Sequence, residues 1–246
     1  MERELQAHIA TYYAPGAWGD RVELAESAAH HATVKRASVG DAVGLSSGDG
    51  RLAVGVIAEL SKKRLVIAVD PNTVERIAAP PRVELWAPVG DRDRMLLLAE
   101  KTVELGVSVW QPVVYARSRS VVPRGEGESF REKVRSRQVS ALEQSGSAWL
   151  PESFAESPFG DRIAADAAGA GASRLLLDAQ GPSIVELLPA LHAPVRIALG
   201  PEGGLEEEER ERFLQAGWQT VSLGANVLRF ETAGIAAVAM VRSHLR

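Results

Sequence analysis

The chain of 246 residues contains no cysteine. Structural disulfides, thiolate zinc sites, iron–sulfur clusters and cysteine nucleophiles are therefore excluded together, which fits the cytoplasm. Long hydrophobic runs are also lacking, since the apolar stretch at residues 235–241 is far too short to span a bilayer. The first six residues carry two acids with no apolar run behind them, unlike a secretory signal or a transit peptide. We therefore expect a cytoplasmic protein without a membrane role.

Several common catalytic motifs are missing as well. The sequence has no phosphate loop of the G-x-x-x-x-G-K-[ST] type and no G-x-S-x-G nucleophile elbow. Gly169 and Gly171 follow no predicted strand and lack the third glycine of a dinucleotide site. The five histidines form neither an i, i+4 pair nor an H-E-x-x-H motif. A metal enzyme is therefore not expected.

The composition that is present is that of a globular protein, with 46% hydrophobic and 24% charged residues. The length predicts one or two domains. The formal net charge of −4 disfavours an avid nucleic-acid binder, but the charge is unevenly spread. Residues 117–137 hold seven basic and three acidic side chains, whereas residues 202–211 hold six glutamates and one arginine. Such runs are typical of solvated helix faces, although the basic one also suits phosphate contacts.

The first seventy residues predict a small β-barrel. Segments 43–45, 53–59 and 65–69 are β-branched or alternating and are separated by turn sequences. Prolines bracket residues 71–81, which resemble a linker. We place the domain boundary near residue 78, so that the domains span residues 1–77 and 78–246.

The second part alternates strands and helices, which predicts an α/β architecture with a mainly parallel sheet. Asp91 is placed to cap a helix that Gly106 ends in the left-handed conformation. The other predicted helices span residues 130–144, 184–189, 206–216 and 232–245. The predicted strands span residues 83–87, 107–114, 174–178, 195–199 and 220–223.

Two glycine-containing loops are the candidate functional segments. The turn G-P-E-G-G at residues 200–204 directly follows a predicted buried strand, where glycine lets the backbone approach a ligand closely. Four acids follow at residues 206–209 and would repel a polyphosphate, whereas a sulfonium cation would tolerate them. The second loop, at residues 222–233, carries Arg229 and Glu231 just before Thr232, a candidate N-cap. Loops at the carboxyl ends of strands in one sheet commonly share a ligand crevice.

Four groups of motifs carry a family resemblance. They are D-R-M at 93–95 with E-K-T-V-E-L-G-V at 100–107, E-Q-S-G at 143–146 with L-P at 150–151, L-G-P-E-G-G at 199–204, and L-G at 223–224 with V-L-R at 227–229 and E-T-A at 231–233. On these residues the chain resembles the SPOUT methyltransferases, most closely the RsmE family. That family methylates N3 of one uridine in bacterial small-subunit (16S) ribosomal RNA. The front of the chain is similar to the family's PUA-like RNA-binding barrel, including His31, Val34, Arg36 and Gly40-Asp41.

The resemblance implies a fold, a cofactor and partners. The fold would be a SPOUT domain with a deep trefoil knot, a rare exception to unknotted folds, behind the PUA-like barrel. The cofactor would be S-adenosyl-L-methionine, and the partners a second copy of the chain and 16S rRNA within the small ribosomal subunit. The expected cofactor site comprises Leu199, Gly200, Pro201, Glu202, Gly203, Gly204, Ser222, Leu223, Gly224, Val227, Leu228, Arg229, Thr232 and Ala233.

The implied reaction needs a group that stabilises an anion and a group that accepts a proton, because the N3–H of uracil must leave. Arg229 is assigned to the first role and either Glu231 or Glu202 to the second. Expected RNA contacts are Lys35, Arg36, Lys62, Lys63, Arg64, Arg94, Arg117 and Arg119.

The chain departs from the family pattern at three positions. Thr33 and Ser147 stand where the family usually has arginine, and Phe230 where it has threonine. Two alternatives therefore stay open. One is a SPOUT enzyme that methylates a ribose 2′-hydroxyl of rRNA or tRNA, and the other is a non-catalytic RNA-binding protein of ribosome assembly.

Overall fold

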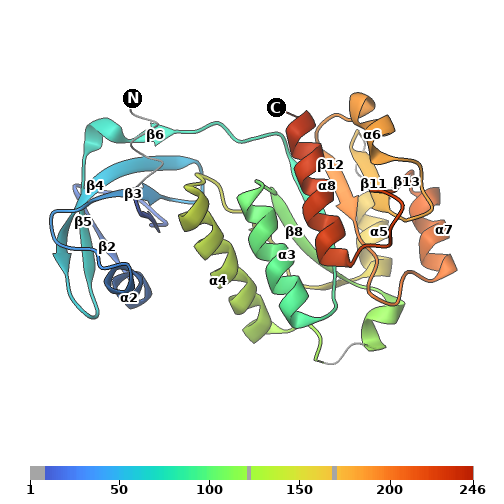
Figure 1. Ribbon diagram of the computed structural model, residues 1–246, viewed down its shortest axis with the longest axis horizontal. Coiled ribbons are helices and arrows are strands. Elements are labelled where there is room, and N and C mark those ends of the chain that lie inside the picture. Colours follow the sequence, from blue (N-terminus) through green and yellow to red (C-terminus); the bar gives the residue numbers. More distant parts are fainter. Residues whose placement is uncertain (1–8, 121–122, 168–170, 246) are drawn as a thin grey trace. The chain divides into compact units, whose positions relative to one another are not determined.

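The computed structural model describes residues 9–120, 123–167 and 171–245. Two compact units are distinguished, each with its own sheet (Figure 1). The first unit contains Met1–Ala79 together with Val139–Leu150, and the second contains Pro80–Gln138 and Pro151–Arg246. The helix α4 (Glu128–Ser145) therefore contributes residues to both units.

The first unit is built on a curled six-stranded sheet of order β1-β3-β4-β5-β2, with β6 paired to β4. Its strands are β1 (Thr11–Tyr13), β2 (Arg21–Leu24), β3 (Ala42–Ser46), β4 (Arg51–Leu60), β5 (Leu65–Val69) and β6 (Glu75–Arg76). The three strands that the sequence predicts here, β3, β4 and β5, pair antiparallel through short turns. Their inward side chains, among them Leu45, Ile57 and Ile67, form the core together with the helix α2 (Glu26–Val34) and the short strands β1 and β2.

The segment Val139–Leu150 is fixed to this sheet by hydrogen bonds. Glu143 accepts one from the backbone N–H of Tyr13 at 3.0 Å and lies 3.2 Å from Nδ1 of His31. The hydroxyl of Ser46 donates to the carbonyl of Ser147 at 2.7 Å. These long-range contacts explain why the segment clusters with the first unit although it is distant in sequence.

The second unit is an α/β layer structure whose sheet has the order β10-β8-β7-β12-β11-β13, with β9 paired to β8. Every strand pair that the structure describes in this sheet is parallel, so the predicted mainly parallel sheet is confirmed. The strands are β7 (Val83–Pro88), β8 (Val109–Val114), β9 (Glu152–Ser153), β10 (Ser157–Pro158), β11 (Ser173–Leu177), β12 (Val195–Ala198) and β13 (Gln219–Val221).

Helices cover both faces of this sheet. On one face α3 (Arg92–Glu104) and α8 (Phe230–His244) lie side by side (Figure 1). On the other, α5 (Phe159–Ala167) and α7 (Glu207–Gln215) bury an aromatic cluster in which Trp86 of β7 packs against Phe213 and Trp218. The remaining helical segments are α6 (Ile184–Leu187), η1 (Pro71–Thr73), η2 (Ala116–Ser120) and η3 (Leu188–Ala190).

The helix α3 forms as the sequence predicts. The carboxylate of Asp91 accepts hydrogen bonds from the N–H groups of Asp93 and Arg94, and Gly106 adopts φ +83° after the last turn. Met95, Leu98 and Thr102 are buried along one face. No helix in the described ranges combines the length and the apolar character needed to cross a membrane.

The predicted start of the last helix is wrong. The N-cap of α8 is Arg229, so the helix begins at Phe230, and Glu231 and Thr232 lie in its first turn instead of in the preceding loop. The buried ring of Phe230 explains the early start, because it anchors the first turn to the apolar interior. Several short elements were not predicted from the sequence, namely α2, α5, β1, β2, β9 and β10.

Candidate active site

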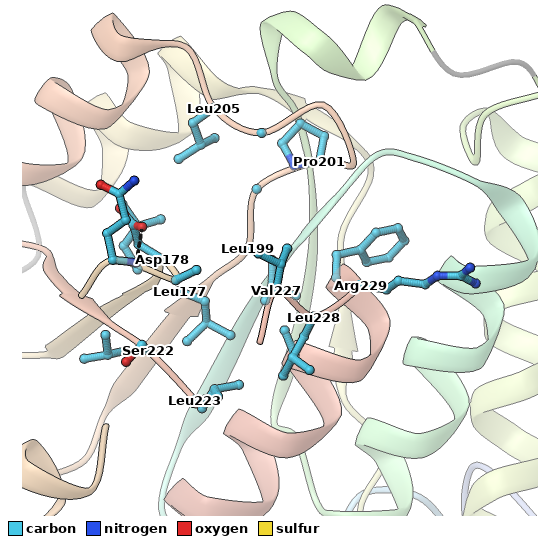
Figure 2. Close-up of a pocket in the computed structure, with 18 of the residues that line it drawn as sticks. Leu177, Asp178, Leu199, Pro201, Leu205, Ser222, Leu223, Val227, Leu228 and Arg229 are labelled. Carbon is cyan, nitrogen blue, oxygen red and sulfur yellow. Dashed lines mark hydrogen bonds between the residues drawn. The ribbon is translucent and has the colours of Figure 1, made fainter. Parts of the chain in front are cut away.

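A cavity of about 830 Å³ lies where the loops after β11, β12 and β13 meet, at the carboxyl ends of these strands. Its size suits a small-molecule ligand. Leu177, Leu199, Leu223 and Leu228 form a largely apolar wall (Figure 2). The two glycine loops that the sequence singles out therefore border one cavity, at the position expected for ligands in parallel sheets.

The turn after β12 is held in a compact form by its own backbone and by a neighbouring arginine. Gly204 has φ +74°, a conformation that side chains rarely adopt, and its N–H donates to the carbonyl of Pro201 at 2.8 Å. Arg117 donates from Nη1 to the carbonyl of Gly203 at 2.7 Å. The turn is thus rigid before any ligand binds, which lowers the entropy lost on binding.

The loop after β13 is fixed at its start and open at its tip. The N–H of Ser222 donates to the carbonyl of Pro182 at 2.7 Å, and the carbonyl of Ser222 accepts from Ile184 at 2.9 Å. Gly224 then turns with φ +145°. Val227, at the tip, is 86% exposed although it borders the cavity. A large exposed apolar side chain at a cavity mouth is available to cover a ligand.

A carboxylate and a guanidinium flank the apolar wall on the side of β11. Asp178, directly after the strand, accepts from the N–H of Gln180 at 2.9 Å and from Nε of Arg210 at 3.1 Å. All three residues line the cavity. The ion pair leaves oxygen atoms of Asp178 in the wall, where they can accept hydrogen bonds from ligand hydroxyl groups.

Two carboxylates and one arginine meet at the start of α3 and α8. Nη1 of Arg94 lies 3.7 Å from Oε1 of Glu202, and its Nε lies 3.9 Å from Oε1 of Glu231. Oε1 of Glu202 also accepts from the N–H of Asp91 at 3.1 Å. Glu202 and Arg94 line the cavity, whereas the carboxylate of Glu231 is buried behind them and its Oε2 has no hydrogen-bond partner within the described residues.

Arg229 borders the cavity from the end of the second loop. It is exposed, and its guanidinium extends away from the leucine wall (Figure 2). A long side chain at this place can swing over a substrate that approaches the mouth.

The structure brings most of the expected cofactor residues together. Those that line the cavity are Leu199, Gly200, Pro201, Glu202, Gly204, Ser222, Leu223, Gly224, Val227, Leu228, Arg229 and Ala233. Gly203 and Thr232 do not line it, because Gly203 packs on Arg117 and Thr232 lies on the exposed side of the first turn of α8.

Sequence reasoning missed the contribution of β11 to the cavity. The lining residues that it did not name for this role are Arg94, Leu176, Leu177, Asp178, Ala179, Gln180, Leu205, Glu207, Arg210, Val221, Asn226 and Phe230. A signal was available, since the polar residues Asp178 and Gln180 lie at the end of a predicted strand and just beyond it. Asp178 and Gln180 lie near the turn at residues 200–204 because β11 pairs with both β12 and β13, and the sequence does not reveal this pairing.

The expected RNA-contacting residues are dispersed. In the first unit, Lys62 and Lys63 lie in the exposed turn before β5, Lys35 is the C-cap of α2 and is followed by Arg36, and Arg64 pairs with Glu23 and Glu59. In the second unit, Arg94 contacts Glu202 of the cavity wall and Arg117 contacts Gly203 in the turn beside the cavity. The side chain of Arg119 lies outside the described residues.

The three departures from the family pattern have local roles. The hydroxyl of Thr33 donates to the carbonyl of Ala29 at 2.9 Å, and the hydroxyl of Ser147 accepts from the N–H of Trp149 at 3.1 Å. Phe230 is buried and lines the cavity. None of the three disrupts the fold around it.

Comparison with known proteins shows that the chain is similar to RNA methyltransferases. A model described as an RNA methyltransferase domain matches residues 78–242, and one described as an RNA methyltransferase PUA domain matches residues 24–70. Ribosomal RNA small subunit methyltransferase E of Mycobacterium bovis is 28% identical over 216 residues, which cover 86% of this chain and 82% of the relative. The protein of that name from Bacillus subtilis is 27% identical over 226 residues, or 88% of this chain and 87% of the relative.

Among solved structures, ribosomal RNA small subunit methyltransferase E from Neisseria gonorrhoeae bound to S-adenosyl methionine is similar to this chain with a TM-score of 0.84 and 25% identity. The match covers 96% of this chain and 98% of that one. A putative methyltransferase from Legionella pneumophila has the same fold, with a TM-score of 0.82 at 23% identity, and the two chains are covered to 96% and 98%. The chain therefore belongs to the RNA methyltransferase family, as its resemblance to the RsmE family predicts.

Proposed function

We propose that this protein transfers the methyl group of S-adenosyl-L-methionine to N3 of a specific uridine in 16S ribosomal RNA. The observation that carries the proposal is the single cavity walled by both glycine loops, with apolar side chains inside and arginine and glutamate side chains at its border. The relatives that match the chain over most of its length are named as small-subunit methyltransferases, which agrees with this substrate.

The residues of the cavity fit this donor. Leu177, Leu199 and Leu223 offer an apolar surface for an adenine ring, and Asp178 offers oxygen acceptors for ribose hydroxyl groups. The loop backbone supplies N–H and C=O groups at close range. Glu202, on the wall, favours a ligand that carries a positive charge. S-adenosyl-L-methionine supplies an electrophilic methyl group on such a charged sulfur.

The residues at the mouth are suited to activate the uridine. Neutral N3 of uracil is a poor nucleophile, and its imide proton must leave as the new bond forms. We assign to Arg229 the stabilisation of the negative charge that develops on the uracil carbonyl oxygens. Glu202 is the better candidate for the proton acceptor, because it lines the cavity and Glu231 does not. Glu231 instead helps to orient Arg94 toward the cavity.

The wider assembly follows from the resemblance. We propose that residues 1–77 act as the RNA-binding domain and residues 78–246 as the methyltransferase domain. We also propose that the protein works as a homodimer on the small ribosomal subunit and that its donor site lies in a trefoil knot. Lys35, Arg36, Lys62, Lys63 and Arg64 are proposed to contact phosphates.

Two measurements test this function. Mass mapping of the modified nucleosides of 16S rRNA from a deletion strain should reveal the loss of one N3-methyluridine. Loss of a 2′-O-methyl group instead would assign the protein to ribose methylation. Calorimetric titration with S-adenosyl-L-methionine should show saturable binding, and its absence would point to a non-catalytic role in ribosome assembly.

A further inference from the structure

A second cavity, of about 610 Å³, lies in the same unit and has no role in the proposed function. It is formed by Trp110 and Pro112 of β8, the segment 151–156 and the first half of α4. Its floor includes Trp110 and Phe130, which are 1% and 3% exposed. Phe154, by contrast, lines the same cavity but is 50% exposed. One aromatic ring is therefore presented at the border of a cavity instead of being packed in the core.

The backbone around Phe154 is held by hydrogen bonds. The N–H of Phe154 donates to the carbonyl of Trp110 at 3.0 Å, and the carbonyl of Ala155 accepts from Nε2 of Gln111 at 3.2 Å. Next to it, Glu156 accepts from the N–H of Gly127 and from Arg131, each at 3.0 Å. An exposed aromatic ring on a rigid backbone is the usual platform on which unpaired bases of RNA stack.

The polar lining indicates which bases suit this platform. Besides Arg131 and its partner Glu156, the cavity is lined by Arg135, by the hydroxyl-bearing Ser153 and by the carboxylates of Glu128 and Glu132. Carboxylates only accept hydrogen bonds, and they bind the amino groups of adenine, cytosine and guanine. Uracil has no amino group, and the N3–H that it can donate is flanked by two carbonyl oxygens, which carboxylates repel. The lining therefore favours an amino-bearing base.

This cavity lies next to the first cavity, the proposed donor cavity, and the first turn of α3 borders both. Arg94 lines the donor cavity and its neighbour Met95 lines the second one. The two residues before this turn also contact the linings of both cavities. The carbonyl of Gly90 accepts from Gly125, which lines the second cavity, at 2.8 Å, and the N–H of Asp91 donates to Glu202, which lines the first. The first turn of α3 therefore borders both cavities.

We propose that this second cavity, the Phe154 cavity, binds an unpaired, amino-bearing nucleotide that flanks the methylated uridine. The proposal rests on the proposed function, because it assumes RNA as the substrate. It gives the enzyme a means to recognise sequence context at a position that is not itself modified. A pocket that selects against uracil also prevents the target base from binding in the wrong cavity.

Fluorescence anisotropy with labelled single-stranded RNA hexamers, oligo(A) and oligo(U), tests the proposal on the full-length protein at one salt concentration. The wild type should bind oligo(A) more tightly than oligo(U). Phe154→Ala should weaken oligo(A) binding about tenfold, the typical effect of losing one stacked base. Phe154→Tyr, which keeps the stacking face, should bind like the wild type. Leu214→Ala, which removes an exposed apolar side chain on α7 outside the cavity, should have no effect.

Several outcomes would overturn the proposal. One is that Phe154→Ala and the wild type bind oligo(A) with equal affinity. Another is that the wild type prefers oligo(U), and a third is that Phe154→Tyr no longer binds oligo(A). Phe154-dependent binding of an octalysine peptide that oligo(A) does not displace would assign the cavity to a basic protein segment instead. Calorimetry with S-adenosyl-L-methionine separates this result from the proposed function. If the wild type binds the donor but its RNA binding does not depend on Phe154, only the proposed role of the Phe154 cavity is contradicted. If the wild type does not bind the donor, the proposed methyltransferase function is contradicted.

Discussion

Arg94 in the first turn of α3 and Glu231 in the first turn of α8 lie with Nε and Oε1 3.9 Å apart. The arginine borders the donor cavity and the glutamate is buried behind it. The pair links a carboxylate that does not reach the cavity to a positive charge that borders it, and we propose that Glu231 positions Arg94 in this way. The predictions below separate such positioning roles from direct ones.

Replacing Arg229 by alanine should abolish methylation and leave donor binding largely intact. The guanidinium is assigned to the charge that develops on the uracil, and removing one such donor typically lowers kcat by about 100-fold or more. Single-turnover methylation of rRNA measures the loss, and calorimetry measures donor affinity. Methylation at the wild-type rate by this variant would show that Arg229 has no such role.

The two glutamates should respond differently to neutral substitution. Glu202→Gln should lower kcat by about 100-fold, because it deletes the proposed proton acceptor. Glu231→Gln should mainly raise KM for RNA, because it loosens Arg94. Steady-state kinetics of both variants measure the two effects, and a fall in kcat in Glu231→Gln with only KM changed in Glu202→Gln would mean that the two roles are reversed.

Gly224→Ala should weaken donor binding by about tenfold, since φ +145° costs a residue with a side chain on the order of 1–3 kcal/mol. The matched control is Ala225→Ser, at the next and exposed position of the same loop, which should bind the donor normally. Calorimetric titration of both variants checks the prediction. Unchanged affinity in Gly224→Ala would mean that the loop conformation does not matter for the donor.

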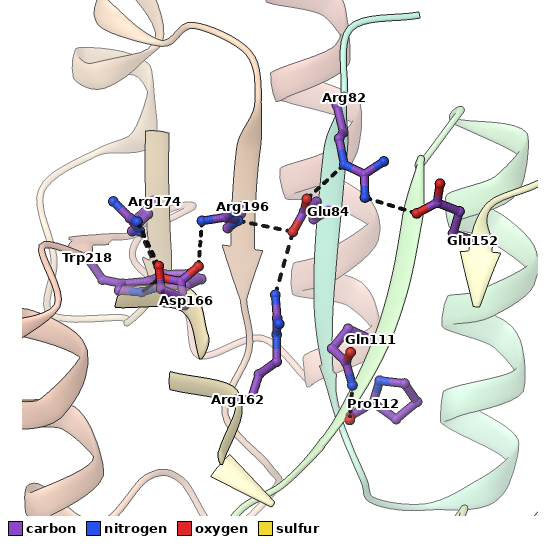
Figure 3. A network of polar contacts seen from close by, with 10 residues as sticks. All are labelled: Arg82, Glu84, Gln111, Pro112, Glu152, Arg162, Asp166, Arg174, Arg196 and Trp218. Atoms are coloured by element: carbon purple, nitrogen blue, oxygen red, sulfur yellow. Dashed lines mark hydrogen bonds and ion pairs between the residues drawn. The ribbon is translucent and has the colours of Figure 1, made fainter. Parts of the chain in front are cut away.

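A buried ion network at the other end of the sheet should contribute to stability and not to catalysis (Figure 3). The side chain of Asp166 is fully buried and accepts from Arg196 at 2.6 Å, from Arg174 at 2.8 Å and from Trp218 at 3.1 Å. Asp166→Asn should lower the free energy of unfolding by about 3 kcal/mol, because it removes the buried negative charge with which both Arg174 and Arg196 pair.

Urea denaturation measures that loss, and the control is a more exposed member of the same network. Glu152 pairs with Arg82 at 3.0 Å, but its side chain is 60% exposed. Glu152→Gln should therefore change stability by less than about 1 kcal/mol. If Asp166→Asn and Glu152→Gln lower the free energy of unfolding equally, the special contribution assigned to the buried charge of Asp166 is contradicted.

Glu156 should make the free energy of unfolding fall as the pH is lowered. Burial raises the pKa of its carboxyl, but hydrogen bonds from backbone N–H groups and from Arg131 outweigh this effect and lower the pKa below its usual value. A folded-state pKa below the unfolded one stabilises the protein above the unfolded pKa, and this stabilisation is lost as the pH falls. The difference in urea midpoint between the wild type and Glu156→Gln should therefore shrink from pH 7 to pH 3. A constant difference would contradict this.

Much of the fold and part of the site were predictable. Asp91 and Gly106 mark both ends of α3 because capping and left-handed termination are local properties. The two glycine loops were identifiable because each follows a strand of strong local pattern. The start of α8 was not predictable from its cap signal, since the burial of Phe230 overrides the preference of Thr232 for the N-cap.

The sequence alone determined the architecture of alternating strands and helices, the two loops and the family, because these depend on local pattern and motif spacing. Only the tertiary structure decided that Asp178 joins the glycine loops, that Arg94 connects Glu202 with Glu231, and that Phe154 borders a cavity of its own. The physical reason is strand order: β11 lies between β12 and β13, so the carboxyl ends of strands that are not consecutive in the chain meet. Pairings of this kind are decided by the burial of whole faces of the sheet and leave no local signal in the sequence.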